Sequence, residues 1–223
     1  MKITFDHVIP NPLKEFIQPN SIWNSHFTFE PGQMYQIIAP SGKGKSTLVG
    51  LLAGTRGDFL GKIYFEGQLT TGLSPYAWSQ WRALQCSVLF QDLQLFPSLT
   101  AMENIQLTAE INQIHEGKNH QNNWVNNDQT IQQWAISLGI DQKMNQLVSK
   151  LSFGQMQRVA ILRALNRPFN WIILDEPFSH LDQNNSEIAV NLIKEIAHAQ
   201  NAGVIITSLD ERYAVSGFTP ITI

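Results

Sequence analysis

Residues 39–47 combine two glycines, two lysines and hydroxyl groups at a spacing that suits phosphate binding. The segment reads Ala-Pro-Ser-Gly-Lys-Gly-Lys-Ser-Thr and directly follows an apolar run. Glycines let consecutive backbone N–H groups converge on phosphate oxygens, and a helix that starts there adds its positive N-terminal end. Lys45 can then reach the β- and γ-phosphates of a nucleotide, and the Ser46 hydroxyl can ligate Mg²⁺. The segment nearly matches the pattern G-x-x-x-x-G-K-[ST] and predicts a nucleotide site.

Ala39 occupies the position of the first glycine in that pattern. A methyl group is tolerated there as long as φ stays negative, because it is a positive φ that favours glycine. The alternative interpretation is a chance Gly/Lys turn before a helix, and the nearly complete spacing favours the nucleotide site. The candidate nucleotide-binding residues of this loop are Pro40, Ser41, Gly42, Lys43, Gly44, Lys45, Ser46 and Thr47.

Two acidic residues follow another apolar run, Trp171 to Leu174. The carboxylate of Asp175 suits Mg²⁺, which prefers oxygen ligands. Glu176 can orient or deprotonate a water molecule that attacks a γ-phosphate. Alone, the pair could be two solvated acids at a strand end. Together with the phosphate-binding loop, it predicts the metal-binding and catalytic residues of one site.

A third motif is the helix start at Leu151-Ser-Phe-Gly-Gln155. Ser152 and Gln155 have the spacing of a capping box, in which each side chain bonds a free backbone N–H group. Gly154 permits the close approach of a ligand. The simpler interpretation is a well-capped helix that continues to about Asn166. The functional one is that this helix start offers its N–H groups to a phosphate held mainly by another subunit.

Short apolar runs predict the strands that carry these motifs. Four of them are typical of parallel strands buried on both faces: 35–39, 86–90, 171–174 and 204–207. The first leads into the phosphate-binding loop, and the others end at Gln91, Asp175 and Ser208. Because ligands bind beyond the carboxyl ends of such strands, we expect the four ends to meet at one crevice. A helix over 45–53 should follow the loop, with Gly54 as its stop.

The remaining segments predict an antiparallel edge and a helical region. Alternating apolar and polar residues in 2–8 and 21–29 indicate two antiparallel strands, and residues 62–65 are expected to join the same antiparallel edge. An amphipathic helix includes Ile131, Trp134, Ala135 and Leu138. Residues 112–127 are rich in Asn, Gln and His and are expected to form a solvated loop. His115 and His120 lie there without further ligands at metal-binding spacing, which favours a surface role.

Composition excludes several classes of protein. The chain has 223 residues, 43% of them hydrophobic, which is enough for a packed core and excludes wholesale disorder. Its net charge of −3 argues against non-specific nucleic-acid binding. No apolar run is long enough to cross a membrane, and the N-terminus resembles no signal peptide. The single cysteine, Cys86, fits a reducing compartment. We therefore expect a cytoplasmic protein.

Taken in order, these motifs resemble the nucleotide-binding subunit of the ABC transporter family over nearly the whole chain. Residues 39–47 look like the Walker A loop, 151–155 like the LSGGQ signature, and 172–176 like Walker B with its catalytic glutamate. Gln91 looks like the glutamine of the Q-loop, and 179–182 resembles the D-loop. The run after Gln91 looks most like the lipoprotein-release and macrolide-export branch.

The resemblance implies an α/β P-loop NTPase fold. Residues 1–95 and 159–223 would form a RecA-like core, a mostly parallel sheet with an antiparallel β edge, and 96–158 an inserted α-helical subdomain. The implied cofactors are ATP and Mg²⁺. The catalytic residues that it implies are Lys45, Gln91, Glu176 and Ser208, and the implied metal ligands are Ser46, Gln91 and Asp175. Nucleotide bound to a second subunit would contact Ser152, Gly154 and Gln155, and the adenine ring would lie on Phe16.

The implied partners are a second ATP-binding subunit, in a homodimer or a heterodimer, and a transmembrane permease on a separate chain. Two subunits would pair head to tail, with each ATP between one Walker A loop and the opposite signature. The chain would lie on the cytoplasmic face of the membrane, and no nucleic acid is expected as a partner.

Two positions depart from the family pattern. Phe153 replaces the first glycine of the signature, and Ser208 stands where the family has its switch histidine. Losing one preorganised transition-state donor costs about 10²–10³ in rate, so we expect slow hydrolysis. A water molecule or Lys43 could compensate. His180, in the D-loop segment, is not assigned this role, because the family places it toward the dimer seam.

Two other functions compete with the transporter ATPase. One is a scaffold or regulatory module that dimerises on ATP with little turnover, which the departures at Ala39, Phe153 and Ser208 favour. Intact Lys45 and Glu176 favour the enzyme. The other is a soluble ABC protein of DNA repair or translation, but the chain has neither the long insertions nor the second cassette of those proteins.

Overall fold

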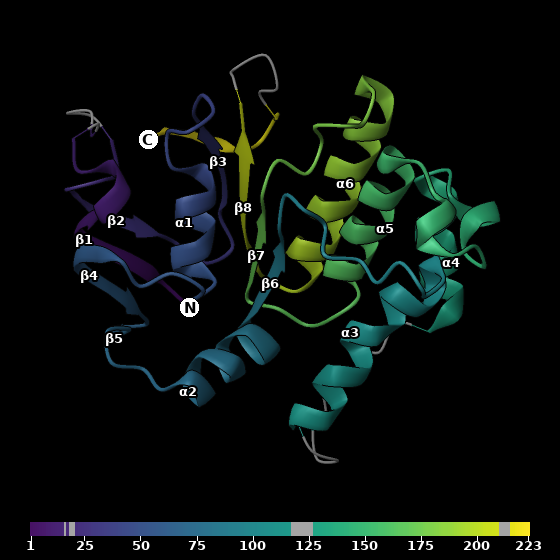
Figure 1. Ribbon diagram of the computed structural model, residues 1–223, viewed down its shortest axis with the longest axis horizontal. Helices are drawn as coiled ribbons and strands as arrows, with labels where there is room; N and C mark the ends of the chain where they lie inside the picture. Colours follow the sequence, from purple (N-terminus) through teal and green to yellow (C-terminus); the bar gives the residue numbers. More distant parts are fainter. Residues whose placement is uncertain (16, 18–20, 117–126, 210–214) are drawn as a thin grey trace.

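The computed structural model describes residues 1–15, 17, 21–116, 127–209 and 215–223. Two β-sheets lie beside a group of helices (Figure 1). The larger sheet has five strands in the order β6-β7-β8-β3-β9, and every pair in it is parallel. Its strands are β3 (Met34–Ile38), β6 (Cys86–Leu89), β7 (Trp171–Leu174), β8 (Gly203–Ser208) and β9 (Thr219–Thr222).

This sheet confirms the predicted parallel strands to within a residue or two at each end. Its carboxyl ends lie at one edge, because Ile38 pairs with Ser208 and Leu174 pairs with both Leu89 and Ile206. Residues of β7 alternate between two cores: Trp171 and Ile173 face one, Ile172 and Leu174 the other. A strand buried on both faces has no polar face, which explains its uninterrupted apolar sequence.

The second sheet is antiparallel, with four strands in the order β2-β1-β4-β5. Its strands are β1 (Ile3–Pro10), β2 (His26–Phe29), β4 (Phe59–Phe65) and β5 (Gln68–Leu69). The predicted antiparallel edge is confirmed, but the strand expected over 21–29 is too long. Residues 21–25 form a turn instead, because Ser25 Oγ donates to Ile22 O, the N–H of Trp23 donates to Ser21 Oγ, and Asn24 has a φ of 56°. Such local side-chain bonds compete with strand pairing.

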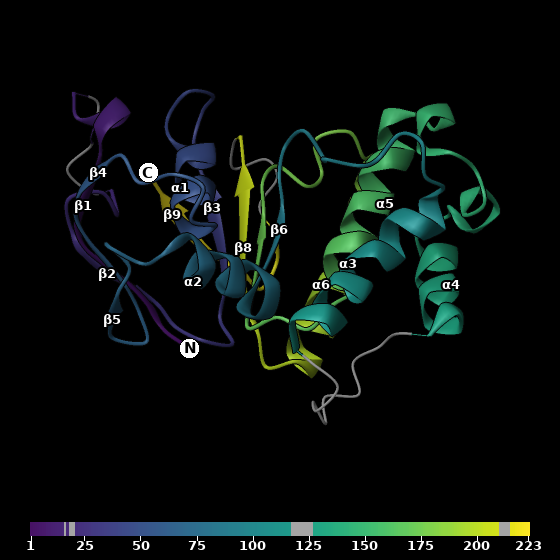
Figure 2. The ribbon, with the colours of Figure 1, turned by 60° about the horizontal axis from the view of Figure 1, so that its bottom comes forward.

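Helices cover both faces of the parallel sheet. Helix α1 packs on one face, between the two sheets, and α3, α5 and α6 pack on the other (Figures 1 and 2). The α-helices are α1 (Lys45–Leu52), α2 (Pro75–Gln80), α3 (Ala101–Glu116), α4 (Asp128–Ser137), α5 (Phe153–Leu165) and α6 (Gln183–Ala199). The shorter turns are the π-helix Trp81–Gln85 and the 3₁₀ helices Asn11–Leu13, Asp141–Lys143 and Val148–Lys150.

One loop prediction is wrong in part. Helix α3 continues to Glu116, so residues 112–116, with His115, are helical rather than a solvated loop. Isoleucine, glutamine and glutamate are compatible with a helix here. The loop was expected only because the segment is rich in Asn, Gln and His, and that composition does not exclude a helix. Residues 117–126, with His120, lie outside the described residues. Within the described part of the chain, no helix combines the length and the apolar character that crossing a membrane requires.

Candidate active site

The loop between β3 and α1 turns sharply at two glycines. Gly42 has a φ of 77° and Gly44 a φ of 104°. Gly44 is also crowded: a Cβ on it would lie 2.5 Å from Leu13 Cδ1. Helix α1 starts at Lys45, directly after this turn, so its first N–H groups face the loop. Ala39 is not among the described residues with positive φ, which agrees with the expectation that alanine is tolerated there.

The side chain of Lys45 contacts both its own loop and the end of another strand. It is buried, and its Nζ lies 2.7 Å from Ala39 O, 3.2 Å from Pro40 O and 3.2 Å from Glu176 Oε1. A buried ammonium group requires such acceptors, because losing water without them is costly. The structure thus joins the lysine of the first motif to the glutamate of the second.

A cavity of about 340 Å³ brings together half of the predicted site residues. It is lined by Ser41, Gly42, Gly44, Lys45, Ser46, Thr47, Gln91, Glu176 and Leu209. Residues that follow the carboxyl ends of four parallel strands, β3, β6, β7 and β8, therefore line one cavity. Of the predicted loop residues, Pro40 and Lys43 are not among those that line it.

Asp175 and Glu176 are held by a residue that sequence reasoning missed. The hydroxyl of Thr207 donates to Asp175 Oδ1 at 2.6 Å and accepts from the N–H of Glu176 at 2.9 Å. Asp175 and Thr207 are both buried. Glu176 has a φ of 49°, a left-handed conformation that is uncommon for a non-glycine residue. A threonine near the end of an otherwise apolar strand was the available signal.

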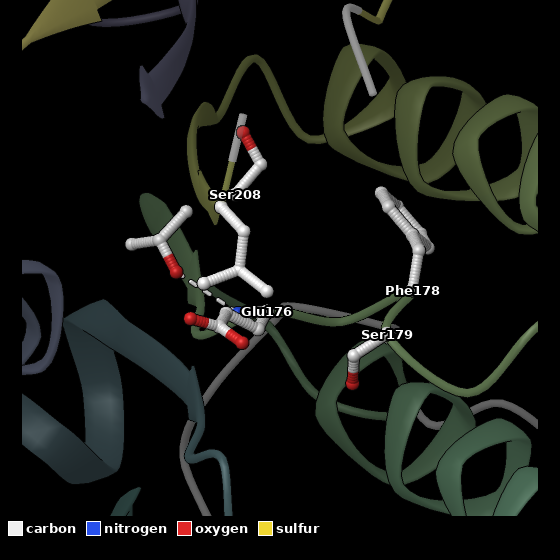
Figure 3. Close-up of a pocket in the computed structure, with 6 residues that line it drawn as sticks. Glu176, Phe178, Ser179 and Ser208 are labelled. Atoms are coloured by element: carbon white, nitrogen blue, oxygen red, sulfur yellow. Dashed lines mark hydrogen bonds between the residues drawn. The ribbon is translucent and has the colours of Figure 1, made fainter. Parts of the chain in front are cut away.

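Ser208 lies beside Glu176 rather than in the larger cavity. Figure 3 shows both residues at a smaller cavity of about 70 Å³, which Phe178, Ser179, Thr207 and Leu209 also line. The Oγ of Ser208 accepts from Gln36 Nε2 at 2.9 Å. Gln36, a buried polar residue within β3, was also missed as a site residue.

The capping box at the start of α5 is present. The N–H of Ser152 donates to Gln155 Oε1 at 3.0 Å, and the N–H of Gln155 donates to Ser152 Oγ at 3.4 Å. Neither Ser152, Gly154 nor Gln155 lines the two cavities described above. Within one chain, the structure therefore does not bring the helix start to the phosphate-binding loop. Phe16 lies outside the described residues.

The oxygen donors near the loop fit Mg²⁺ in the presence of a nucleotide. Ser46 and Gln91 line the same cavity, and Asp175 lies directly before Glu176. Hydroxyl, amide and carboxylate oxygens suit this hard cation. In the part of the chain that the structure describes, no cluster of three or more His, Cys, Asp or Glu side chains could hold a metal ion. Mg²⁺ would therefore take its other ligands from phosphate groups and water, as it commonly does.

Comparisons with known proteins agree with this geometry. The sequence model described as "ABC transporter" matches residues 22–179, well over half of the chain. The uncharacterized ABC transporter ATP-binding protein YclH of Bacillus subtilis (strain 168) is 32% identical over 190 residues, which cover 85% of this chain and 79% of YclH. The ABC transporter ATP-binding protein YtrE of the same organism is 30% identical over 186 residues, covering 83% and 77%.

Solved structures match over the whole chain. The ATP-binding cassette MJ0796, in a dimeric post-hydrolysis state bound to ADP and Pi, has a TM-score of 0.79 at 24% identity and covers 100% of this chain and 94% of its own. A bacterial Atm1-family ABC exporter with ATP bound has a TM-score of 0.74 at 22% identity and covers 100% and 37%. These two show the α/β P-loop NTPase fold. With the family match and the two relatives, they lead to one conclusion: the chain belongs to the ABC transporter family, as a nucleotide-binding subunit with an ATPase site.

Proposed function

We propose that this chain binds and hydrolyses ATP to power a transporter whose membrane-spanning part is a separate chain. The observation that carries the proposal is the cavity in which the phosphate-binding loop, Gln91 and Glu176 meet. Within it, Lys45 Nζ lies 3.2 Å from Glu176 Oε1, so the phosphate-binding cation and the expected base share one hollow.

The residues then act in a defined order. The γ-phosphate of ATP replaces Glu176 as a partner of Lys45, which frees the carboxylate of Glu176. This carboxylate orients a water molecule and accepts its proton as the water oxygen attacks the γ-phosphorus, and the bond to the β-phosphate oxygen breaks. Mg²⁺, held by Ser46, Gln91 and Asp175, would neutralise charge that develops on the phosphate oxygens.

The second half of the site comes from a second copy of this chain. The chain carries both a phosphate-binding loop and a capped helix start with Ser152, Gly154 and Gln155, and the two are apart within one chain. Two copies that pair head to tail complete each other's sites. The dimeric state of MJ0796 supports this arrangement. Phe16 keeps its proposed place under the adenine ring on the strength of the resemblance.

The membrane partner would dock on the segment that follows Gln91, within the proposed helical subdomain 96–158. Phe96 is 51% exposed and Leu147 is 37% exposed. Backbone bonds link the two segments, since Leu147 forms a β-bridge with Thr100. Exposed apolar residues on neighbouring segments are typical of a protein interface. This surface would place the chain on the cytoplasmic face of the membrane.

ATPase activity of the purified chain with Mg²⁺ tests the enzyme directly. Lys45→Ala is expected to abolish hydrolysis, whereas the matched variant Lys62→Ala, at an exposed lysine of β4, should keep the wild-type rate. Calorimetry that detected no binding of ATP or ADP in the presence of Mg²⁺ would contradict the proposal.

The scaffold function makes a different prediction. It is favoured by Ser208, whose hydroxyl cannot carry positive charge and already accepts a bond from Gln36. For the enzyme, Glu176→Gln should trap an ATP-bound dimer that the wild type does not accumulate in size-exclusion chromatography. Equal and persistent dimers of both proteins would establish the scaffold instead. We further propose that Ser208 makes turnover slow, so that Ser208→His should raise kcat.

A further inference from the structure

His180 is an exposed imidazole that is fixed to the start of α5. Its ring centroid lies 4.3 Å from that of Phe153, at an interplanar angle of 62°. Its backbone N–H donates to Gln157 Oε1 at 3.1 Å. Its carbonyl oxygen would lie 2.8 Å from a Cβ on Gly154, so only glycine allows this approach. All three contacts are with the first turns of α5, and His180 therefore moves with the start of that helix.

Gln157 extends this connection to the catalytic glutamate. Its side chain is 1% exposed, and its Nε2 donates to Glu176 O at 3.1 Å and to Ser179 Oγ at 3.5 Å. One buried amide thus joins α5 to the backbone on both sides of the turn that follows β7. A bonded amide in such a position holds the turn in one arrangement, because an unsatisfied buried group would be costly. Gln157 is a positioning residue for His180.

Within its own chain, His180 does not serve the site that contains Ser208. Glu176, Ser179 and Ser208 line the smaller cavity, and His180 is not among the lining residues. The imidazole instead lies on the exposed side, beside Phe153, which is 44% exposed. A ligand that bonds the start of α5 from outside the chain would therefore meet His180 as well.

We infer that His180 acts in trans, as a catalytic residue of the partner's ATP site. This inference rests on the proposed head-to-tail dimer, in which the start of α5 faces the γ-phosphate bound to the other copy. An imidazole N–H of His180 then donates a hydrogen bond to a γ-phosphate oxygen. This bond supplies, from across the seam, part of the transition-state stabilisation that Ser208 cannot provide. No proton is transferred; the bond stabilises charge that develops on the phosphate.

Mixed dimers of two differently tagged copies show whether His180 acts on the ATP site of its own copy or on that of the other copy. In each dimer, one copy carries Lys45→Ala, so that only the other copy has a working phosphate-binding loop. When His180→Ala is on the working copy, its ATP still meets His180 of the Lys45→Ala copy, and we expect the reference rate. When His180→Ala is on the Lys45→Ala copy, kcat should fall about 10²-fold while KM for ATP changes little.

His180→Ala preserves the contacts that hold the turn, because its N–H and carbonyl remain. His198→Ala, at an exposed histidine in the last turn of α6, is the matched control and should keep the reference rate in both positions. The inference would be overturned if the rate were the same whichever copy carried His180→Ala. It would also be overturned if the rate fell only when the working copy carried His180→Ala. If the wild-type homodimer has no ATPase activity, the proposed function itself fails.

A double-mutant comparison gives a second readout. If His180 supplies the donor missing at Ser208, then Ser208→His should raise kcat more in the His180→Ala background than in the wild type. A merely structural role for His180 predicts the same fold-increase in both backgrounds, and that result would contradict the inference. His180→Gln, which keeps an N–H donor, should recover part of the rate that alanine loses.

Discussion

Replacing Thr207 with valine removes the hydroxyl that connects the two acidic residues of the site. This hydroxyl donates to Asp175 Oδ1 at 2.6 Å and accepts from the N–H of Glu176 at 2.9 Å. Thr207 is 1% exposed and Asp175 is 2% exposed, so water does not readily take its place. Valine has nearly the same shape as threonine, and the substitution therefore tests the two hydrogen bonds rather than packing.

The expected cost follows from the two groups that lose their partner. A hydrogen bond to a charged group contributes about 1.5–3 kcal/mol, and an unpaired buried N–H costs about 1–3 kcal/mol. Together these give a loss of about 2.5–6 kcal/mol in the free energy of unfolding. With an m-value of about 3 kcal/mol/M in urea, the unfolding midpoint should fall by roughly 1–2 M. Turnover should fall too, because the N–H bond holds Glu176 in its left-handed conformation.

Urea unfolding followed by tryptophan fluorescence measures this cost, since Trp171 is buried on the strand that directly precedes Asp175. Thr207→Ser keeps the hydroxyl and loses only a methyl group, so it should remain closer to the wild type in both stability and kcat. A Thr207→Val protein whose stability lies within about 1 kcal/mol of the wild type, with unchanged kcat, would refute the bridging role; this limit is the lower end for one lost bond.

Three further predictions concern the fold. Burial raises the pKa of the Cys86 thiol from 9.0 to about 12, so a thiol reagent at pH 8 should modify Cys86 only after unfolding. The contribution of the neutral thiol to stability should be complete below pH 9 and decline as the pH rises toward 12. The N–H of Asn185 lowers the pKa of Asp182, the N-cap of α6, below its usual 3.8. The stability that this cap contributes is therefore present above pH 3.8 and is lost as the pH falls below it. In an acid titration followed by circular dichroism, Asp182→Asn should make stability depend less on pH. In Gly203→Ala, the new Cβ would lie 2.3 Å from Trp171 Cζ3, which should cost about 1–3 kcal/mol in a urea titration.

Parallel strands were predictable because burial on both faces leaves a simple sequence pattern. An apolar run followed by a polar residue predicted three strand ends, at Phe90, Leu174 and Thr207. The observed ends, at Leu89, Leu174 and Ser208, lie within one residue of them, and the sheet brings them to one edge. The order of the strands was not predictable in this way, since it depends on pairing between distant segments. The edge strand β9 escaped notice because Pro220 interrupts it, and proline is tolerated in a strand mainly at an edge.

The residues that the sequence did not identify are those that act on other site residues. Gln36, Gln157 and Thr207 are buried polar residues inside apolar elements, and each bonds a group near the end of β7 or β8. Helical and strand periodicity indicates which residues are buried, but it does not indicate where a buried donor points. Likewise, Phe153 and His180 are 27 positions apart, and only the packing of α5 against the turn after β7 brings their rings together.

The pair formed by Lys45 and Glu176 links nucleotide binding to the chemistry that would follow. The buried ammonium group of Lys45 is satisfied by Ala39 O, Pro40 O and the carboxylate of Glu176. The carboxylate of Glu176 thus serves as the counter-ion of Lys45. A phosphate that bonds Lys45 brings its own negative charge and takes over that role. On the proposed function, the carboxylate of Glu176 would then be free to orient the attacking water once ATP is bound.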